Sequence, residues 1–252
     1  MQFLKDFKQG VFIASHSFNM IWNNLLLLCY LGIPILFNII INIIVYNKVV
    51  LSAENFGLQY FLYYLIYFFI IIFANCCLIK HVTMLFKNKK ITIQHIVTTT
   101  FSKIKRIIAW TILSCIPMLT WHFTSLIKYK NSGLPIVFTI LSLTPLIVGS
   151  IWTVLTVFAL PILINEECSF ASIFSRSFSI LYKKLFIYSG GIFLIGVFLS
   201  FSMIFFMAIE YFAYIYFLIR ITTISHIATT ITGCLFSTTH TLLKTTLYHQ
   251  DN

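Results

Sequence analysis

Charged residues are scarce in this sequence, since only 9% of its 252 residues are Asp, Glu, Lys or Arg and only six are acidic. Soluble domains carry about 25% charged residues. A chain that is 60% hydrophobic is therefore excluded from that class.

Cysteine pairs and enzyme motifs are also missing. None of the six cysteines forms a Cys-x-x-Cys pair, so neither structural zinc nor disulfide bonds are expected. The chain has no His-Glu-x-x-His, no glycine-rich phosphate loop and no aspartate cluster. Ser189-Gly190-Gly191 resembles an intramembrane protease motif only faintly, because residue 187 is not glycine. We expect no catalytic activity, no metal and no cofactor.

What the sequence does contain is long apolar runs. Six runs are long enough to cross about 30 Å of hydrocarbon as helices of about 20 residues. They cover residues 24–46, 58–79, 107–127, 134–160, 185–207 and 216–243. Helices satisfy their own backbone hydrogen bonds in lipid, and the runs are too continuous for the strands of a β-barrel. We therefore predict an all-α, multi-pass membrane protein with six transmembrane helices in a single domain, residues 1–252. The middles of the first five runs hold no charge, which disfavours ion coupling through a carboxylate.

The distribution of Lys and Arg predicts the orientation. If both termini lie on one side of the membrane, that side holds thirteen of the 17 basic residues. The other side holds only Lys48, Lys128, Lys130 and Arg220. By the positive-inside rule both termini are cytoplasmic. The net charge of +11 is spread over several juxtamembrane segments, so we expect anionic lipid head groups as partners, and no nucleic acid.

Similar segments precede the first, third and fifth runs. They read SFNMIWNNLL at residues 17–26, TFSKIKRIIA at 100–109 and SFSILYKKLF at 177–186. Apolar residues recur there every three or four positions, which is typical of a helix that lies on the membrane surface. The second apolar stripe, for example, comprises Ile93, Val97, Phe101, Ile104 and Ile108. Either three tandem units, each a surface helix and a two-span hairpin, or chance similarity between juxtamembrane helices accounts for the pattern.

Residues 158–186 contain the most specific pattern. We expect Pro161 to end the preceding helix and Ser169 to cap a helix that begins near residue 170. An ion pair between Glu166 and Arg176 then holds the loop against that helix. A structural loop at the membrane surface is the favoured interpretation, and a ligand site is the alternative.

The same segment carries a resemblance to a known family. A proline, a glutamate, an Arg-Ser pair and a basic pair follow one another at fixed spacing: Pro161, Glu166, Arg176, Ser177, Lys183 and Lys184. This pattern resembles that of a largely uncharacterised family of bacterial six-helix integral membrane proteins, whose fold also occurs as the membrane domain of some glycerophosphodiester phosphodiesterases. The chain departs from it at Ile173 and Phe186, where alanine and tryptophan are usual. The resemblance implies an architecture and no reaction.

The sixth run differs from the others because it has a small polar face at helical spacing. The face comprises Thr222, His226, Thr230, Ser237, His240 and Lys244. Either these residues permit close helix packing, or they line a hydrated pathway or substrate groove. Asn75, in the second run, is more typical of an interhelical hydrogen bond than of a substrate ligand. Our leading hypothesis is a structural or accessory membrane protein, and the alternative is a transporter or channel for a small or amphiphilic solute.

Overall fold

The computed structural model describes residues 2–24, 26–30, 32, 56–89, 92–117, 120, 135–217 and 222–250. All regular structure within these residues is helical, so the all-α prediction is confirmed for this part of the chain. The helices are α1 (Gln2–Asn23), α3 (Phe56–Phe86), α4 (Ile93–Phe101), α5 (Ile104–Ser114), α7 (Pro135–Thr156), α8 (Ala159–Asn165), α9 (Phe170–Phe217) and α10 (Thr222–His249).

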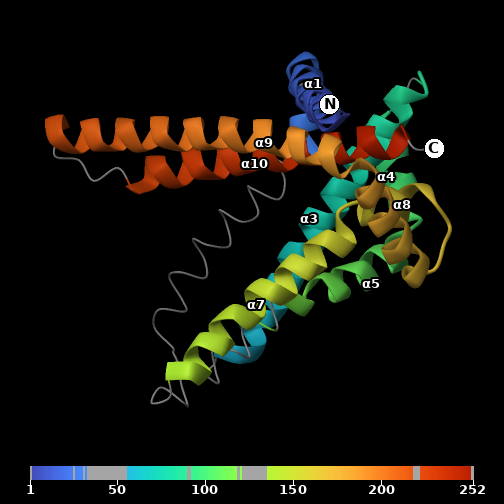
Figure 1. The fold of residues 1–252 in the computed structure, drawn as a ribbon, viewed down its shortest axis with the longest axis horizontal. Helices are drawn as coiled ribbons and strands as arrows, with labels where there is room; N and C mark the ends of the chain where they lie inside the picture. Colours follow the sequence, from blue (N-terminus) through green and yellow to red (C-terminus); the bar gives the residue numbers. More distant parts are fainter. Residues whose placement is uncertain are drawn as a thin grey trace.

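The helices form two arms that diverge from a common end (Figure 1). One arm consists of α9 and α10, which lie side by side, and the other contains α3, α5 and α7. We call the end at which the arms meet the junction. It consists of α4, α8, residues 170–184 of α9 and residues 244–249 of α10. The two ends of the chain lie near the junction, and α1 packs across α9 there.

Three apolar segments of the described chain are long enough to cross a membrane: Leu65–Phe86, Leu143–Asn165 and Phe170–Ile209. They correspond to the runs predicted at 58–79, 134–160 and 185–207. The run at 24–46 lies mostly outside the described residues, as does the second half of the run at 107–127. α10, which contains most of the sixth run, is not among the three segments.

The last part of α9 shows why a membrane is the appropriate solvent for this chain. Large apolar side chains cover this part of the helix on all sides, and Phe201 and Met207 each expose 70% of their surface. A soluble monomer rarely exposes a continuous apolar surface of this length. The described residues thus include three helices that are long and apolar enough to cross a membrane, which is typical of a membrane protein.

A break between α7 and α8 corrects the expected effect of Pro161. The preceding helix ends at Thr156, and helical structure resumes at Ala159 with Pro161 inside α8. Proline lacks an N–H group, and its ring collides with the carbonyl group four residues earlier, here that of Val157. Pro161 therefore interrupts the helix four residues upstream of its own position and does not end it.

The backbone of α9 leaves helical geometry at Lys184, where φ is −114° and ψ is 19°. This residue directly precedes the run predicted to begin at residue 185. The kink separates residues 170–183, which pack at the junction, from the long apolar part of the helix. A surface helix that turns into an apolar helix was the predicted arrangement for this segment.

The second predicted stripe is interrupted, which corrects the expectation of one helix through residues 93–108. α4 ends at Phe101 and α5 begins at Ile104. The hydroxyl groups of Thr98, Thr99 and Ser102 donate to carbonyl groups three or four residues earlier, and such bonds bend helices. Four of the five stripe residues are exposed, so the apolar face of this segment points outward.

The three similar segments bury the same two positions. In each, an isoleucine and a Ser or Thr four residues later precede a phenylalanine. At most 5% of the surface of these residues is exposed, and they are Ile13 and Ser17, Ile96 and Thr100, and Ile173 and Ser177. The structure therefore uses corresponding positions of the three segments in the same way.

α1 and α9 approach each other closely enough for backbone contact. A β-carbon on Gly10 would lie 1.8 Å from the carbonyl oxygen of Ile187, and one on Gly190 would lie 2.1 Å from that of Phe7. Only glycine permits this approach. The Ser189-Gly190-Gly191 sequence therefore serves helix packing, and the Ser189 hydroxyl donates to the carbonyl of Leu185 in its own helix.

Candidate functional site

Glu166 is the centre of a polar network at the junction. One carboxylate oxygen forms an ion pair with Arg176, and the other accepts a hydrogen bond of 2.7 Å from the hydroxyl of Tyr248. The predicted pair is thus present, and it ties the α8–α9 loop both to α9 and to the end of α10. Burial raises the pKa of Tyr248, and the hydrogen bond to Glu166 raises it further.

Two further residues of the same pattern, Ser177 and Pro161, lie at the break between α7 and α8. The buried Ser177 hydroxyl accepts a 3.0 Å hydrogen bond from the N–H of Phe158, a group that the break leaves without a helical partner. Pro161 is buried, and its carbonyl accepts from the Asn165 side chain. Ser169 accepts from the N–H of Ser172 and so caps α9, as predicted. The four residues Pro161, Glu166, Arg176 and Ser177 thus lie together at the junction.

Basic side chains bind backbone carbonyl groups at the junction, a role that sequence reasoning missed. Arg106 donates to the carbonyl oxygens of Glu166 and Cys168, both at 2.7 Å. Lys103 donates to that of Ile164 at 2.9 Å, and Lys184 to that of Leu247 at 2.6 Å. The carbonyl groups of Ile164 and Leu247 lie in the last turns of α8 and α10, where cations are favoured. These three basic residues therefore stabilise the junction, and the sequence signal they leave is only their charge.

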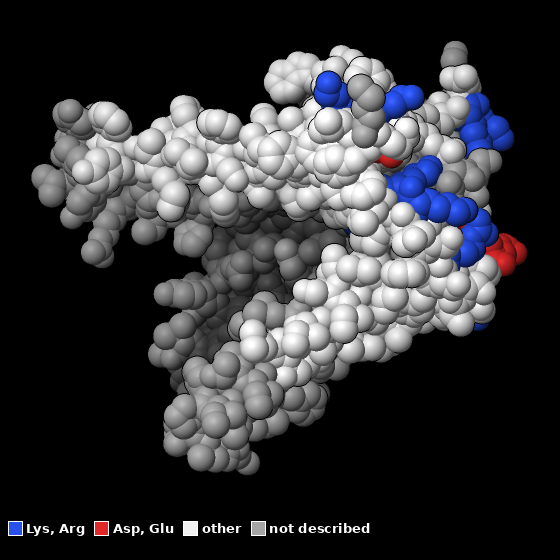
Figure 2. Space-filling model, in the orientation of Figure 1, with Lys and Arg blue, Asp and Glu red and all other residues white. Residues whose placement is uncertain are grey.

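Other basic residues remain free of such contacts and lie at the surface. Figure 2 shows Lys and Arg gathered at the junction end of the molecule. The exposed lysines of this end are Lys5, Lys8, Lys87, Lys89, Lys105 and Lys183. We call this set the basic face.

The polar face predicted on the sixth run is only partly described. Thr222, His226 and Thr230 belong to α10, but their side chains lie outside the described residues. Ser237 is half-buried, and Nε2 of His240 lies 2.7 Å from the hydroxyl of Tyr188 on α9. Because this contact joins two adjacent helices, it favours the helix-packing interpretation of the polar face.

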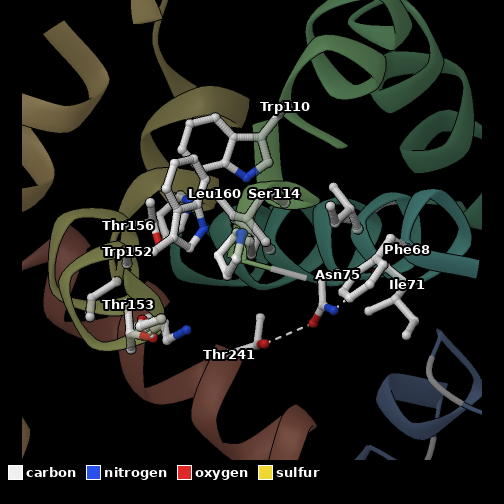
Figure 3. Close-up of a pocket in the computed structure, with 17 residues that line it drawn as sticks. Phe68, Ile71, Asn75, Trp110, Ser114, Trp152, Thr153, Thr156, Leu160 and Thr241 are labelled. Carbon is white, nitrogen blue, oxygen red and sulfur yellow. Dashed lines mark hydrogen bonds between the residues drawn. The ribbon is translucent and has the colours of Figure 1, made fainter. Parts of the chain in front are cut away.

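A cavity of about 420 Å³ lies beside the junction, between α3, α5, α7 and α10 (Figure 3). Its volume is within the range of about 300–1,000 Å³ of small-molecule sites. Most of the wall is apolar, and it includes Phe68, Ile71 and the indole rings of Trp110 and Trp152. Within the described chain, no three His, Cys, Asp or Glu residues are grouped in a way that could hold a metal ion.

A hydrogen bond between Asn75 and Thr241 connects α3 and α10 at the cavity wall. The Thr241 hydroxyl donates to Oδ1 of Asn75 at 2.8 Å, while the Asn75 amide donates to the carbonyl of Ile71 (Figure 3). Asn75 therefore makes the interhelical hydrogen bond that its position suggested.

Lys244 is the charged residue of the cavity wall. It is half-buried, and its ammonium group makes no hydrogen bond or ion pair with a described residue. Burial lowers the pKa of Lys244 to about 8, so the side chain is still a cation at neutral pH. Among the described residues of the predicted polar face, Lys244 is the one that lines this cavity.

Comparison with known proteins identifies one family. Residues 53–250 match a family of unknown function, DUF6159. No curated protein and no solved structure matches the chain. The match does not extend to the glycerophosphodiester phosphodiesterases that the motif resembles. Because it covers most of the sequence, the chain belongs to the DUF6159 family.

Proposed function

We propose that this protein is a non-catalytic accessory protein of the bacterial inner membrane, with six spans and both termini in the cytoplasm. Its basic face binds anionic lipid head groups. Its three surface helices belong to three tandem units, each of which also contains a two-span hairpin. One observation carries the proposal. The segments predicted to be cytoplasmic, residues 80–106, 161–184 and both ends of the chain, converge at the junction, where the exposed lysines gather (Figure 2).

This convergence supports a single orientation because the segments are far apart in the sequence. α3, α5, α7 and α10 each have one end at or near the junction and extend away from it (Figure 1). Hairpins that begin and end on the same side of a membrane produce this arrangement.

Cysteine labelling in intact spheroplasts tests the orientation. In a chain without its native cysteines, Asn88→Cys lies in the turn after α3, and Asn47→Cys lies in the loop predicted on the opposite side. A membrane-impermeant maleimide is expected to label Asn47→Cys only, and to reach Asn88→Cys after lysis. Labelling of Asn88→Cys in intact spheroplasts would refute the orientation.

Lipid dependence of the thermal stability tests the partner. Anionic lipid is expected to raise the melting temperature in nanodiscs, since each juxtamembrane lysine contributes about 1 kcal/mol near such a surface. The triple variant Lys87→Gln, Lys89→Gln, Lys105→Gln should lose most of this increase. The triple variant Lys48→Gln, Lys128→Gln, Lys130→Gln removes the same charge on the predicted opposite side and should retain it. Equal losses in the two variants would contradict a cytoplasmic lipid contact.

The cavity favours a second function, which is transport of a small or amphiphilic solute. α10 contributes Thr241 and Lys244 to its wall, in line with the alternative predicted for the sixth run. Flux of a solute into proteoliposomes would establish this function and displace the accessory role.

A further inference from the structure

We propose that the cavity between α3, α5, α7 and α10 binds an anionic amphiphile, a molecule with one carboxylate or phosphate group and a hydrocarbon chain. This inference goes beyond the accessory function. It can fail while that function stands, because the cavity lysine is not part of the basic face.

The charge of the cavity points to an anion. Lys244 lies on the wall, and none of the described lining residues is acidic. Glu166, the acidic residue at the centre of the junction network, already accepts from Arg176 and Tyr248. A cation removed from water without a counter-charge is destabilising. An anion in the cavity would provide that charge.

Among the other polar groups of the wall, the two indole rings offer hydrogen-bond donors. Oδ1 of Asn75 already accepts from Thr241, and the Thr156 hydroxyl donates to the carbonyl of Trp152 in its own helix. The indole N–H groups of Trp110 and Trp152 make no hydrogen bond with a described residue, and Figure 3 shows the Trp110 nitrogen on the side of its ring that faces the other lining residues. Indole nitrogen is a donor only. These groups, with the ammonium of Lys244, match the oxygens of a carboxylate or phosphate.

The rest of the wall suits a hydrocarbon chain. Phe68 and Ile71 lie at one end of the cavity, and Trp152 and Thr153 lie at the other (Figure 3). Phe68 and Ile71 belong to the apolar segment Leu65–Phe86, on its side away from the junction. Tryptophan is enriched at the head-group level of a membrane. A lipid-derived molecule would thus place its head group near Lys244 and its chain along α3.

Heavy-atom quenching of tryptophan fluorescence gives a direct measurement. In a full-length background with Trp22→Phe and Trp121→Phe, only the two cavity tryptophans fluoresce. Dibromostearate is the anionic probe, and its methyl ester is the neutral probe of the same chain. Oleate, lysophosphatidic acid and inorganic phosphate serve as competitors, and the purified protein is studied in a mild non-ionic detergent.

Two variants test the site in different ways. Lys244→Met removes the charge and keeps the length of the side chain. Gly149→Leu fills the cavity and leaves Lys244 intact, since Gly149 lines the cavity and a β-carbon there would have nothing within 4 Å. The matched controls are Lys48→Met, a lysine that belongs neither to the cavity wall nor to the basic face, and Gly196→Leu, a position on α9 with the same open space.

The anionic probe is expected to quench saturably and to be displaced by oleate or lysophosphatidic acid, whichever carries the preferred head group. Lys244→Met should raise its dissociation constant about 10- to 100-fold, as expected for loss of a charged hydrogen bond. Gly149→Leu should abolish quenching, and both controls should bind as the parent does. Equal quenching by the ester, or unchanged affinity in both cavity variants, would overturn the proposal. Displacement by inorganic phosphate alone would also overturn it, because a soluble anion would then be the ligand.

Discussion

The junction and the outer part of α9 use their side chains in opposite ways. At the junction, buried polar side chains bind backbone groups of other segments, as Ser177 does with Phe158 and Lys184 with Leu247. Beyond residue 197, α9 points large apolar side chains outward, including Phe201 and Met207. Among the described residues, polar contacts between distant segments are therefore a feature of the junction, while the outer part of α9 presents an exposed apolar surface.

The difference follows from the two solvents. In the proposed orientation the junction lies near the head groups, where water competes for polar groups, so many specific contacts are needed to hold several helix ends together. In hydrocarbon, apolar side chains gain little from burial against one another, and close packing becomes the main source of association. Substitutions should therefore have large effects at the junction and small effects on the outer part of α9.

Two glycines of α9, between the junction and the outer part of the helix, provide the strongest test of close packing against open surface. Gly190→Ala would place a β-carbon 2.1 Å from the carbonyl oxygen of Phe7, and backbone on both sides leaves no side chain to move away. We expect a loss of about 3 kcal/mol, at the upper end of overpacking effects. Thermal unfolding of the detergent-solubilised protein, followed by circular dichroism, measures it.

Gly196→Ala is the control, six residues further along the same helix. A β-carbon there would meet nothing within 4 Å. The substitution should be neutral or stabilise the protein by up to about 1 kcal/mol, because alanine favours the helix. Equal destabilisation by both substitutions would show that the α1–α9 contact does not limit stability.

Arg106→Ala addresses the junction itself. Its guanidinium bridges the carbonyl oxygens of Glu166 and Cys168 and so holds α5 against the loop that precedes α9. Hydrogen bonds to charged groups contribute about 1.5–3 kcal/mol, so we expect the melting temperature to fall clearly. Lys105→Ala removes a neighbouring exposed cation and should change it little. A larger decrease in melting temperature for Lys105→Ala than for Arg106→Ala would mean that surface charge, and not carbonyl binding, stabilises the junction.

Local features of the junction were predictable from sequence because they depend on short spacing. Ser169 and Ser172, whose N–H it accepts, lie three residues apart, and Glu166 and Arg176 are brought together by the helix that begins between them. The kink at Lys184 likewise falls where an amphipathic pattern gives way to a continuous apolar one. In each case the signal and the structure lie within one segment.

Contacts between distant segments were not predictable. The bonds from Arg106 to Cys168 and from Lys184 to Leu247 each join residues about 60 positions apart. From sequence alone, Arg106 and Lys184 cannot be distinguished from other basic residues next to an apolar run. The same holds for Gly10, whose contact with α9 depends on how two helices cross. Lys244 was assigned to a polar face, but only the packing of four helices reveals the cavity beside it.

Arg176→Ala is expected to have the smallest effect, although Arg176 belongs to the most recognisable motif. Its side chain is 48% exposed, against 16% for Glu166, and ion pairs with an exposed partner contribute about 0.2–1 kcal/mol. Glu166 also keeps its hydrogen bond from Tyr248 in the variant. We expect a small decrease in melting temperature in detergent, less than that of Arg106→Ala. A larger decrease would show that the ion pair, and not the carbonyl contacts, is the main connection at the junction. An unchanged melting temperature together with loss of a cellular phenotype would instead identify Arg176 as part of a functional surface.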